Sequence, residues 1–224
     1  MQDLFEFHEE NYAGLRTGDI LLCSADPLIA RSYSSQAFMI ASLQRWMLRR
    51  KFTHVGMIYI RDGEHLLWES DINLAHDLET NTRYAGCRIL DLKERINNYP
   101  GEVWYSRIRI NDHEERQAEL EEGLAMSIRK YHGRPYESKR REFIRIFYDG
   151  IGGHNKTNTH EMFCSELVAA TLQHMGLLKL PPEGPPSNEY GPNDFSINGR
   201  GMPLDLINAT LSHDVPLKSR LIRS

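Results

Sequence analysis

Residues 52–70 of this chain read Phe-Thr-His-Val-Gly-Met-Ile-Tyr-Ile-Arg-Asp-Gly-Glu-His-Leu-Leu-Trp-Glu-Ser, and they carry the clearest structural signal in the sequence. Two runs rich in β-branched and aromatic residues flank Asp62-Gly63, a pair that favours the type I′ turn of a two-residue hairpin. The pattern predicts an antiparallel hairpin in which Gly56 faces Glu69 and His54 faces Asp71.

This register places a group of polar side chains on one face of the hairpin. Because side chains alternate along a strand, His54, Gly56, Glu69 and Asp71 are expected to emerge together, with Glu69 diagonal to His54. The missing side chain of Gly56 leaves room for an imidazole and a carboxylate to meet. A slip of one residue would destroy the arrangement, so the register is a testable prediction.

A cysteine-bearing helix is predicted over residues 158–176. Asn158 or Thr159 can cap its start, and Gly176 follows its last turn as a C′ residue. Cys164 lies in the first turns, on the apolar face, where unpaired backbone N–H groups stabilise a thiolate. A nucleophile would be placed in this way, and the alternative is a small buried hydrophobic residue.

The composition is typical of a soluble globular protein with one domain over residues 1–224, and the predicted mixture of strands and helices is that of an α+β fold. Apolar residues make up 40 % and charged residues 26 %, and the net charge of -4 argues against a nucleic-acid binder. We find neither a secretory signal nor an apolar run that could span a membrane. Three cysteines in no paired pattern suggest free thiols, and therefore a cytoplasmic location.

The remaining elements are predicted from periodicity and turn signals. Residues 30–50 suit an amphipathic helix with a basic end, which either packs on the core or contacts an anionic membrane surface. Residues 181–224 are expected to be mostly loop with a short C-terminal element. The other expectations are strands at 18–24, 87–90 and 102–109, an irregular stretch at 72–86, and helices at 92–98, 111–130 and 139–148.

Four motifs together resemble a known enzyme family. Gly18-Asp-Ile-Leu-Leu22, Thr53-His-Val-Gly-Met-Ile-Tyr59 and Leu66-Leu-Trp-Glu69 are similar to the strand module of NlpC-type papain-like hydrolases. In ordinary members the cysteine helix precedes this module, whereas Phe163-Cys-Ser-Glu-Leu-Val168 follows it here. The order resembles the circularly permuted branch, which includes YiiX-like proteins and relatives of lecithin:retinol acyltransferase.

The resemblance implies a papain-like core, with an antiparallel sheet packed against helices, and a thiol mechanism without cofactor or metal. Cys164 would be the nucleophile, His54 the general base and then acid, and Glu69 the residue that orients the imidazole. Asp71 is the alternative to Glu69 as the residue that orients the imidazole. The backbone N–H of Cys164 would be one oxyanion donor, and Tyr33 and Asp19 are the side chains to inspect for a second.

The substrate stays open at this level. Permuted relatives suggest a lipid-linked amide, ester or thioester, and unpermuted relatives suggest a cell-wall-type peptide. Two other readings compete with an enzyme of this kind. One is a ligand-binding module without turnover. The other is a metal site built from His54, His65, Asp71 and His76, against which we count the absence of HExxH or CxxC spacing and an expected position of His65 on the opposite face.

Overall fold

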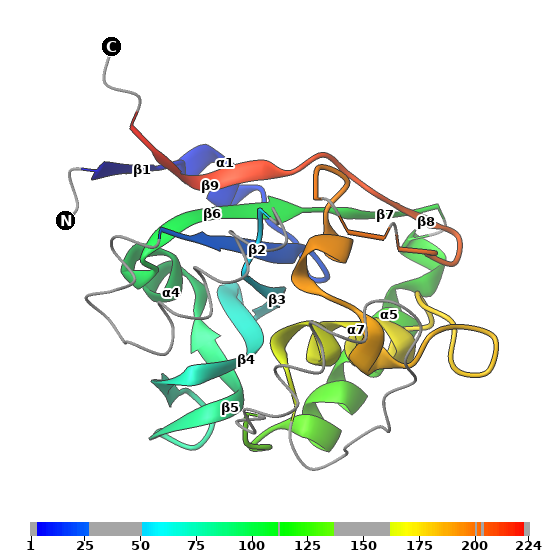
Figure 1. Cartoon of the computed structure of the whole chain (residues 1–224). Helices are drawn as coiled ribbons and strands as arrows, with labels where there is room; N and C mark the ends of the chain where they lie inside the picture. Colours follow the sequence, from blue (N-terminus) through cyan, green and yellow to red (C-terminus); the bar gives the residue numbers. More distant parts are fainter. Residues whose placement is uncertain are drawn as a thin grey trace.

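The computed structural model describes residues 4–26, 51–111, 113–136, 162–199, 201–202 and 204–221 (Figure 1). The helices predicted at 30–50 and 139–148 lie outside these residues. The chain has an α+β fold, with one large antiparallel sheet and helices on both of its faces.

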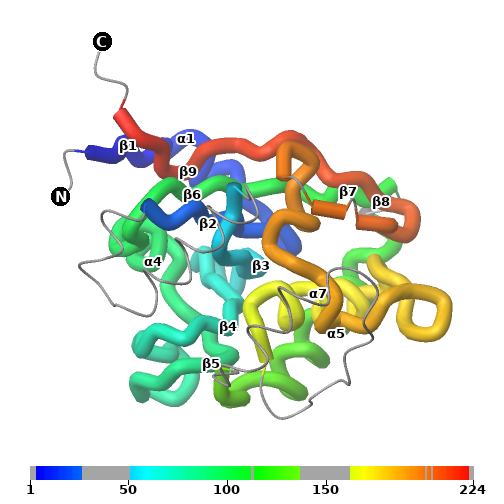
Figure 2. Tube along the Cα trace, in the orientation of Figure 1, coloured from blue at the N-terminus to red at the C-terminus, as the bar shows by residue number. Residues whose placement is uncertain are grey.

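Seven strands form the main sheet in the order β1-β9-β6-β2-β3-β4-β5. The first and last strands of the chain pair with each other, and Figure 2 shows the blue and red ends of the trace side by side. Two further strands, β7 (Ile108–Ile110) and β8 (Ala209–Leu211), form a separate pair. The strands of the main sheet are β1 (Phe5–Phe7), β2 (Ile20–Ala25), β3 (His54–Arg61), β4 (Glu64–Asp77), β5 (Thr82–Asp91), β6 (Gly101–Ser106) and β9 (Val215–Arg220).

The hairpin of β3 and β4 has the predicted register. Met57 pairs with Trp68 and Arg61 with Glu64. Asp62 and Gly63 have φ values of 54° and 83°, as a turn with two left-handed residues requires.

The stretch at 72–86 is more regular than the sequence suggested. β4 continues to Asp77 and β5 begins at Thr82, so most of this stretch forms a second hairpin. The pairing shifts between Asp71 and Ala75, and this irregularity breaks the alternation from which a strand is recognised.

The sheet has an apolar core on each face. On one face Val55, Met57 and Trp68 pack with the helices α5 (His113–Tyr131) and α7 (Cys164–His174). On the other face Ile58 and Leu67 pack with α4 (Leu92–Asn98). The sheet therefore separates the cysteine helix from α4 along most of its length (Figure 1).

The cysteine helix begins later than predicted. Its first residue is Cys164 and its N-cap is Phe163, and the predicted caps Asn158 and Thr159 lie outside the described residues. Glu166 supplies the capping interaction, because its carboxylate accepts a hydrogen bond from the Phe163 N–H at 3.4 Å. The predicted end is correct: Gly176 adopts a φ of 66° directly after the C-cap.

The C-terminal region contributes more to the fold than a loop would. Two short 3₁₀ helices, η2 (Ser187–Glu189) and η3 (Pro192–Phe195), interrupt the proline-rich part. The short element expected after it is β9, which pairs with both β1 and β6 inside the main sheet. In the described part of the chain, none of the helices combines the length and the apolar character needed to cross a bilayer.

Candidate active site

His54 stands at the very start of β3, and its side chain is buried with 8 % of the residue exposed. Side chains along β3 alternate between the two faces of the sheet, so His54 lies on the same face as Ile58, the face that α4 covers. β3 begins at this residue, so the imidazole lies at the end of the strand. There it lines the same cavity as Cys164, the first residue of α7.

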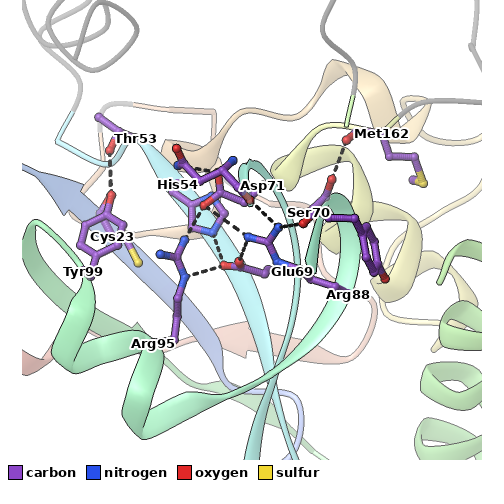
Figure 3. A network of polar contacts seen from close by, with 12 residues as sticks. Cys23, Thr53, His54, Glu69, Ser70, Asp71, Arg88, Arg95, Tyr99 and Met162 are labelled. Carbon is purple, nitrogen blue, oxygen red and sulfur yellow. Dashed lines mark hydrogen bonds and ion pairs between the residues drawn. The ribbon is translucent and has the colours of Figure 1, made fainter. Parts of the chain in front are cut away.

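Glu69 orients the imidazole in the way the hairpin register predicts. The Nε2 atom of His54 lies 2.8 Å from Oε2 of Glu69, in a contact buried from solvent (Figure 3). Since Nε2 is occupied by the carboxylate, Nδ1 is the ring nitrogen that remains for another partner.

Cys164 faces the same cavity as His54. Both residues line one cavity of about 920 Å³, and Cys164 is among the groups that raise the pKa of His54. Cys164 is the first residue of α7, so its backbone N–H has no acceptor within the helix. Cys164 and His54 thus lie at the wall of a cavity large enough for an organic ligand, and Glu69 is buried behind the imidazole.

The carboxylate of Glu69 is surrounded by cations. Nη2 of Arg88 donates to Oε1 at 2.9 Å, and Nε of Arg95 donates to Oε2 at 3.1 Å. Burial alone would raise the pKa of Glu69, but Arg95, His54 and Arg88 hold it well below its usual range. Glu69 is therefore ionised although it is completely buried.

The charge on Glu69 controls the protonation of His54. Burial alone would lower the pKa of His54, but the Glu69 carboxylate and the Cys164 side chain raise it to about 10. This raised pKa favours the protonated imidazolium form of His54, which can donate a proton.

Other residues considered at the sequence level have different positions. Asp71 does not bind His54; its Oδ1 accepts from the Asn73 N–H at 3.0 Å, and its Oδ2 pairs with Arg95. Asp19 is buried in a bidentate pair with Arg107 and does not line the cavity. Tyr33 lies outside the described residues.

Tyr136 is a site residue that sequence reasoning missed. It lines the same cavity as Cys164, and its ring packs edge-on against Phe163 with centroids 5.6 Å apart. Burial, followed by the negative charges of Cys164 and Asp71, raises the pKa of Tyr136 well above its ordinary value. Its backbone is held at the edge of β5, where the N–H donates to the Ala85 carbonyl at 3.4 Å. No local pattern marks a residue placed by such a long-range contact.

The structure does not favour the metal site considered from the sequence. Among the described residues, His54, Glu69 and Asp71 place donor atoms within 4.8 Å of one another, as a cation site would. Arg88 and Arg95 already occupy these carboxylates, and a divalent cation would have to displace both guanidinium groups.

His65 also does not belong to a metal site. It pairs with Ile60, which puts it on the same face as His54, so the sequence-level placement on the opposite face was wrong. Its ring packs against Tyr12 in a tilted arrangement with centroids 4.8 Å apart, and His65 does not line the cavity. His76 does line the cavity, on the distal part of β4.

Comparisons with known proteins do not assign a family. No family model matches the chain, and no curated protein is similar to it. A solved structure, that of the metalloprotein YiiX from Escherichia coli O157:H7, aligns with a TM-score of 0.45 at 18 % identity, over 93 % of this chain and 97 % of that chain. The papain-like core and the circular permutation stay predictions.

Proposed function

We propose that this protein is a cysteine hydrolase or acyltransferase that cleaves an amide, ester or thioester bond through an acyl-enzyme on Cys164. The observation that supports the proposal most strongly is that Cys164 and His54 line one cavity while Glu69, buried behind them, contacts His54 at 2.8 Å. A nucleophile, a base in contact with it and a third group that orients the base are the parts that thiol catalysis requires.

In the first half of the reaction, the Cys164 thiolate attacks the substrate carbonyl carbon, and the electron pair of the C=O bond moves to oxygen. The tetrahedral intermediate collapses, the bond to the leaving amine, alcohol or thiol breaks, and the His54 imidazolium donates its proton to that group. In the second half, neutral His54 takes a proton from water or another acceptor. This acceptor attacks the thioester and releases Cys164 as the thiolate beside a reprotonated His54.

We propose two donors that would stabilise the oxyanion. The backbone N–H of Cys164 belongs to the first turn of α7, where the partial positive charge of the helix adds to the hydrogen bond. We assign the second donor to the hydroxyl of Tyr136, in place of Tyr33 or Asp19, because Tyr136 lines the cavity and is influenced by the charge of Cys164.

The cavity lining favours a substrate with an apolar part. Leu74, Leu78 and Leu90 line it, and Leu74 is 65 % exposed although it is a large apolar residue. A lipid-linked acyl group would cover this surface, and a cell-wall-type peptide is the competing substrate. The three cysteines are buried free thiols, and a cytoplasmic location would keep them reduced.

Labelling with a thiol-reactive acyl probe tests the proposal. We expect a single acyl adduct on Cys164, located by peptide mass spectrometry. The adduct should be absent in Cys164→Ala and should form about 100-fold more slowly or worse in His54→Ala, since a positioned acid–base group contributes roughly 10²–10⁴ in rate. Comparing acyl-lipid and peptide probes separates the two substrate classes.

Cys23→Ala and Cys87→Ala are matched controls, because both residues are buried thiols outside the proposed chemistry. These variants should label as fast as the unmodified protein. Equal labelling of all three cysteines, or a His54→Ala variant that reacts at the normal rate, would show that the protein binds a ligand without this chemistry.

A further inference from the structure

The hydrogen bonds to Glu69 are not equivalent. Within the described ranges, Oε1 accepts only from Arg88 on β5, whereas Oε2 accepts from both His54 and Arg95 (Figure 3). Arg95 therefore binds the same oxygen that orients the imidazole. Arg95 also forms an ion pair with Asp71, so its guanidinium group bridges the two buried carboxylates of the site, Glu69 and Asp71.

Arg95 is itself held firmly by the helix that carries it. Asp91 caps the start of α4 by accepting from the Glu94 N–H at 2.6 Å. At the other end, Nζ of Lys218 donates to the carbonyl groups of the last turn and of Tyr99, at 2.8 to 3.0 Å. The guanidinium carbon also lies 5.3 Å from the centroid of the Tyr99 ring. A planar fork fixed in this way can hold a carboxylate in one orientation.

A buried carboxylate without such a partner would be neutral, or would turn to whichever donor remained. Of the favourable interactions with Glu69, the charge of Arg95 is the largest, ahead of His54 and Arg88. Loss of the Arg95 charge would raise the pKa of Glu69, and a less ionised Glu69 would raise the pKa of His54 by less. The same loss would leave Asp71, close to the imidazole, with the longer ion pair to Arg88 at 4.0 Å.

We propose that Arg95 is a positioning residue of the site, which fixes Oε2 of Glu69 toward His54 and so keeps the imidazole protonated and aligned with Cys164. The assignment rests on the proposed function, in which that imidazolium is the acid and base. It goes beyond the three residues of the motif, because the element involved is α4, which packs on the opposite face of the sheet from the cysteine helix.

The titratable and charged groups around this cluster come from every element packed on it, and Cys23 is uncharged among them because burial raises the pKa of its thiol far above the usual range. They are Cys23 on β2, Glu69 and Asp71 on β4, Arg88 on β5, Arg95 on α4, Tyr99 after it, Tyr136, and Cys164 on α7.

The test is an NMR titration of the His54 side chain, assigned by its loss in His54→Gln, together with the rate of acyl-probe labelling. In Arg95→Met, which keeps most of the side-chain volume, the midpoint of the His54 titration should fall by about one to three pH units. Labelling of Cys164 should slow by tenfold or more at neutral pH. Arg95→Lys keeps the charge without the fork and should show a smaller change of the same sign.

Arg61→Met is the matched control, since Arg61 forms an ion pair with Glu79 at the exposed end of the same hairpin. It should leave both readouts unchanged. If Arg95→Met does not fold, Arg95→Lys decides the question. A His54 midpoint and labelling rate that match the unmodified protein in the folded Arg95 variants would overturn the assignment and leave the proposed function standing. A His54 that titrates near its ordinary pKa in the unmodified protein, together with an unlabelled Cys164, would overturn the proposed function itself.

Discussion

At Gly56 the backbone of β3 passes unusually close to its neighbours. A Cβ atom placed there would lie 2.8 Å from Cδ1 of Leu67, 3.2 Å from the Trp68 carbonyl oxygen and 3.4 Å from Cβ of Glu69. Glycine is required here by packing, and the space it leaves is where the Glu69 side chain turns toward His54. The sequence predicted this use of Gly56 from the hairpin register alone.

Gly56→Ala should therefore destabilise the protein by about 1–3 kcal/mol, the usual cost of forcing extra volume into a packed core. Urea denaturation measures the free energy of unfolding directly. Gly14→Ala is the control, because its φ of -84° suits any residue and the nearest atoms to a new Cβ would be at least 3.7 Å away. Equal stability of the two variants would mean that β3 and β4 do not approach each other as described.

At the scale of elements, α4 depends on an anchor from the far end of the chain. Lys218 lies on β9, is 8 % exposed, and its ammonium group binds the carbonyls of Ile96, Asn97 and Tyr99. The last carbonyls of a helix have no partner within it, so a cation at this place satisfies them and complements the helix dipole. β9 thus stabilises the helix that carries Arg95.

Lys218→Met should cost about 2–3 kcal/mol of folding free energy, since it removes charged hydrogen bonds and leaves buried carbonyls unpaired. The variant should also label more slowly at Cys164, because α4 no longer holds Arg95 in place. Lys93→Met is the control on the same helix: Lys93 pairs with Glu9 at 2.8 Å in an exposed contact worth little. A Lys218→Met protein with the stability of Lys93→Met would contradict this role.

Elements with strong local signals could be predicted from sequence. The Asp62-Gly63 turn fixed one hairpin, and the helix predicted at 92–98 has these bounds in the structure. Elements defined by tertiary contacts could not. β9 follows a proline-rich stretch and is stabilised by pairing with strands from the other end of the chain. The start of α7 was placed too early because polar residues before Cys164 resemble caps, whereas Glu166 makes the capping contact.

At the scale of the whole molecule, the site is assembled from distant parts of the sequence. His54 and Glu69 share a hairpin, so their meeting followed from its register. Arg88 and Arg95 come from β5 and α4, and no periodicity predicts which helix covers which face of the sheet. The cysteine helix covers the face opposite to α4, and Cys164 reaches His54 only because α7 and β3 begin at the same edge of the cavity.

The central claim is that Glu69 acts on Cys164 only through His54. The direct test is a double-mutant cycle on the rate of Cys164 labelling by the acyl probe, with the unmodified protein, Glu69→Gln, His54→Ala and the double variant. We predict that Glu69→Gln slows labelling by about tenfold or more when His54 is present and has no further effect in the His54→Ala background. An equal slowing in both backgrounds would contradict the claim, because Glu69 would then act without the imidazole.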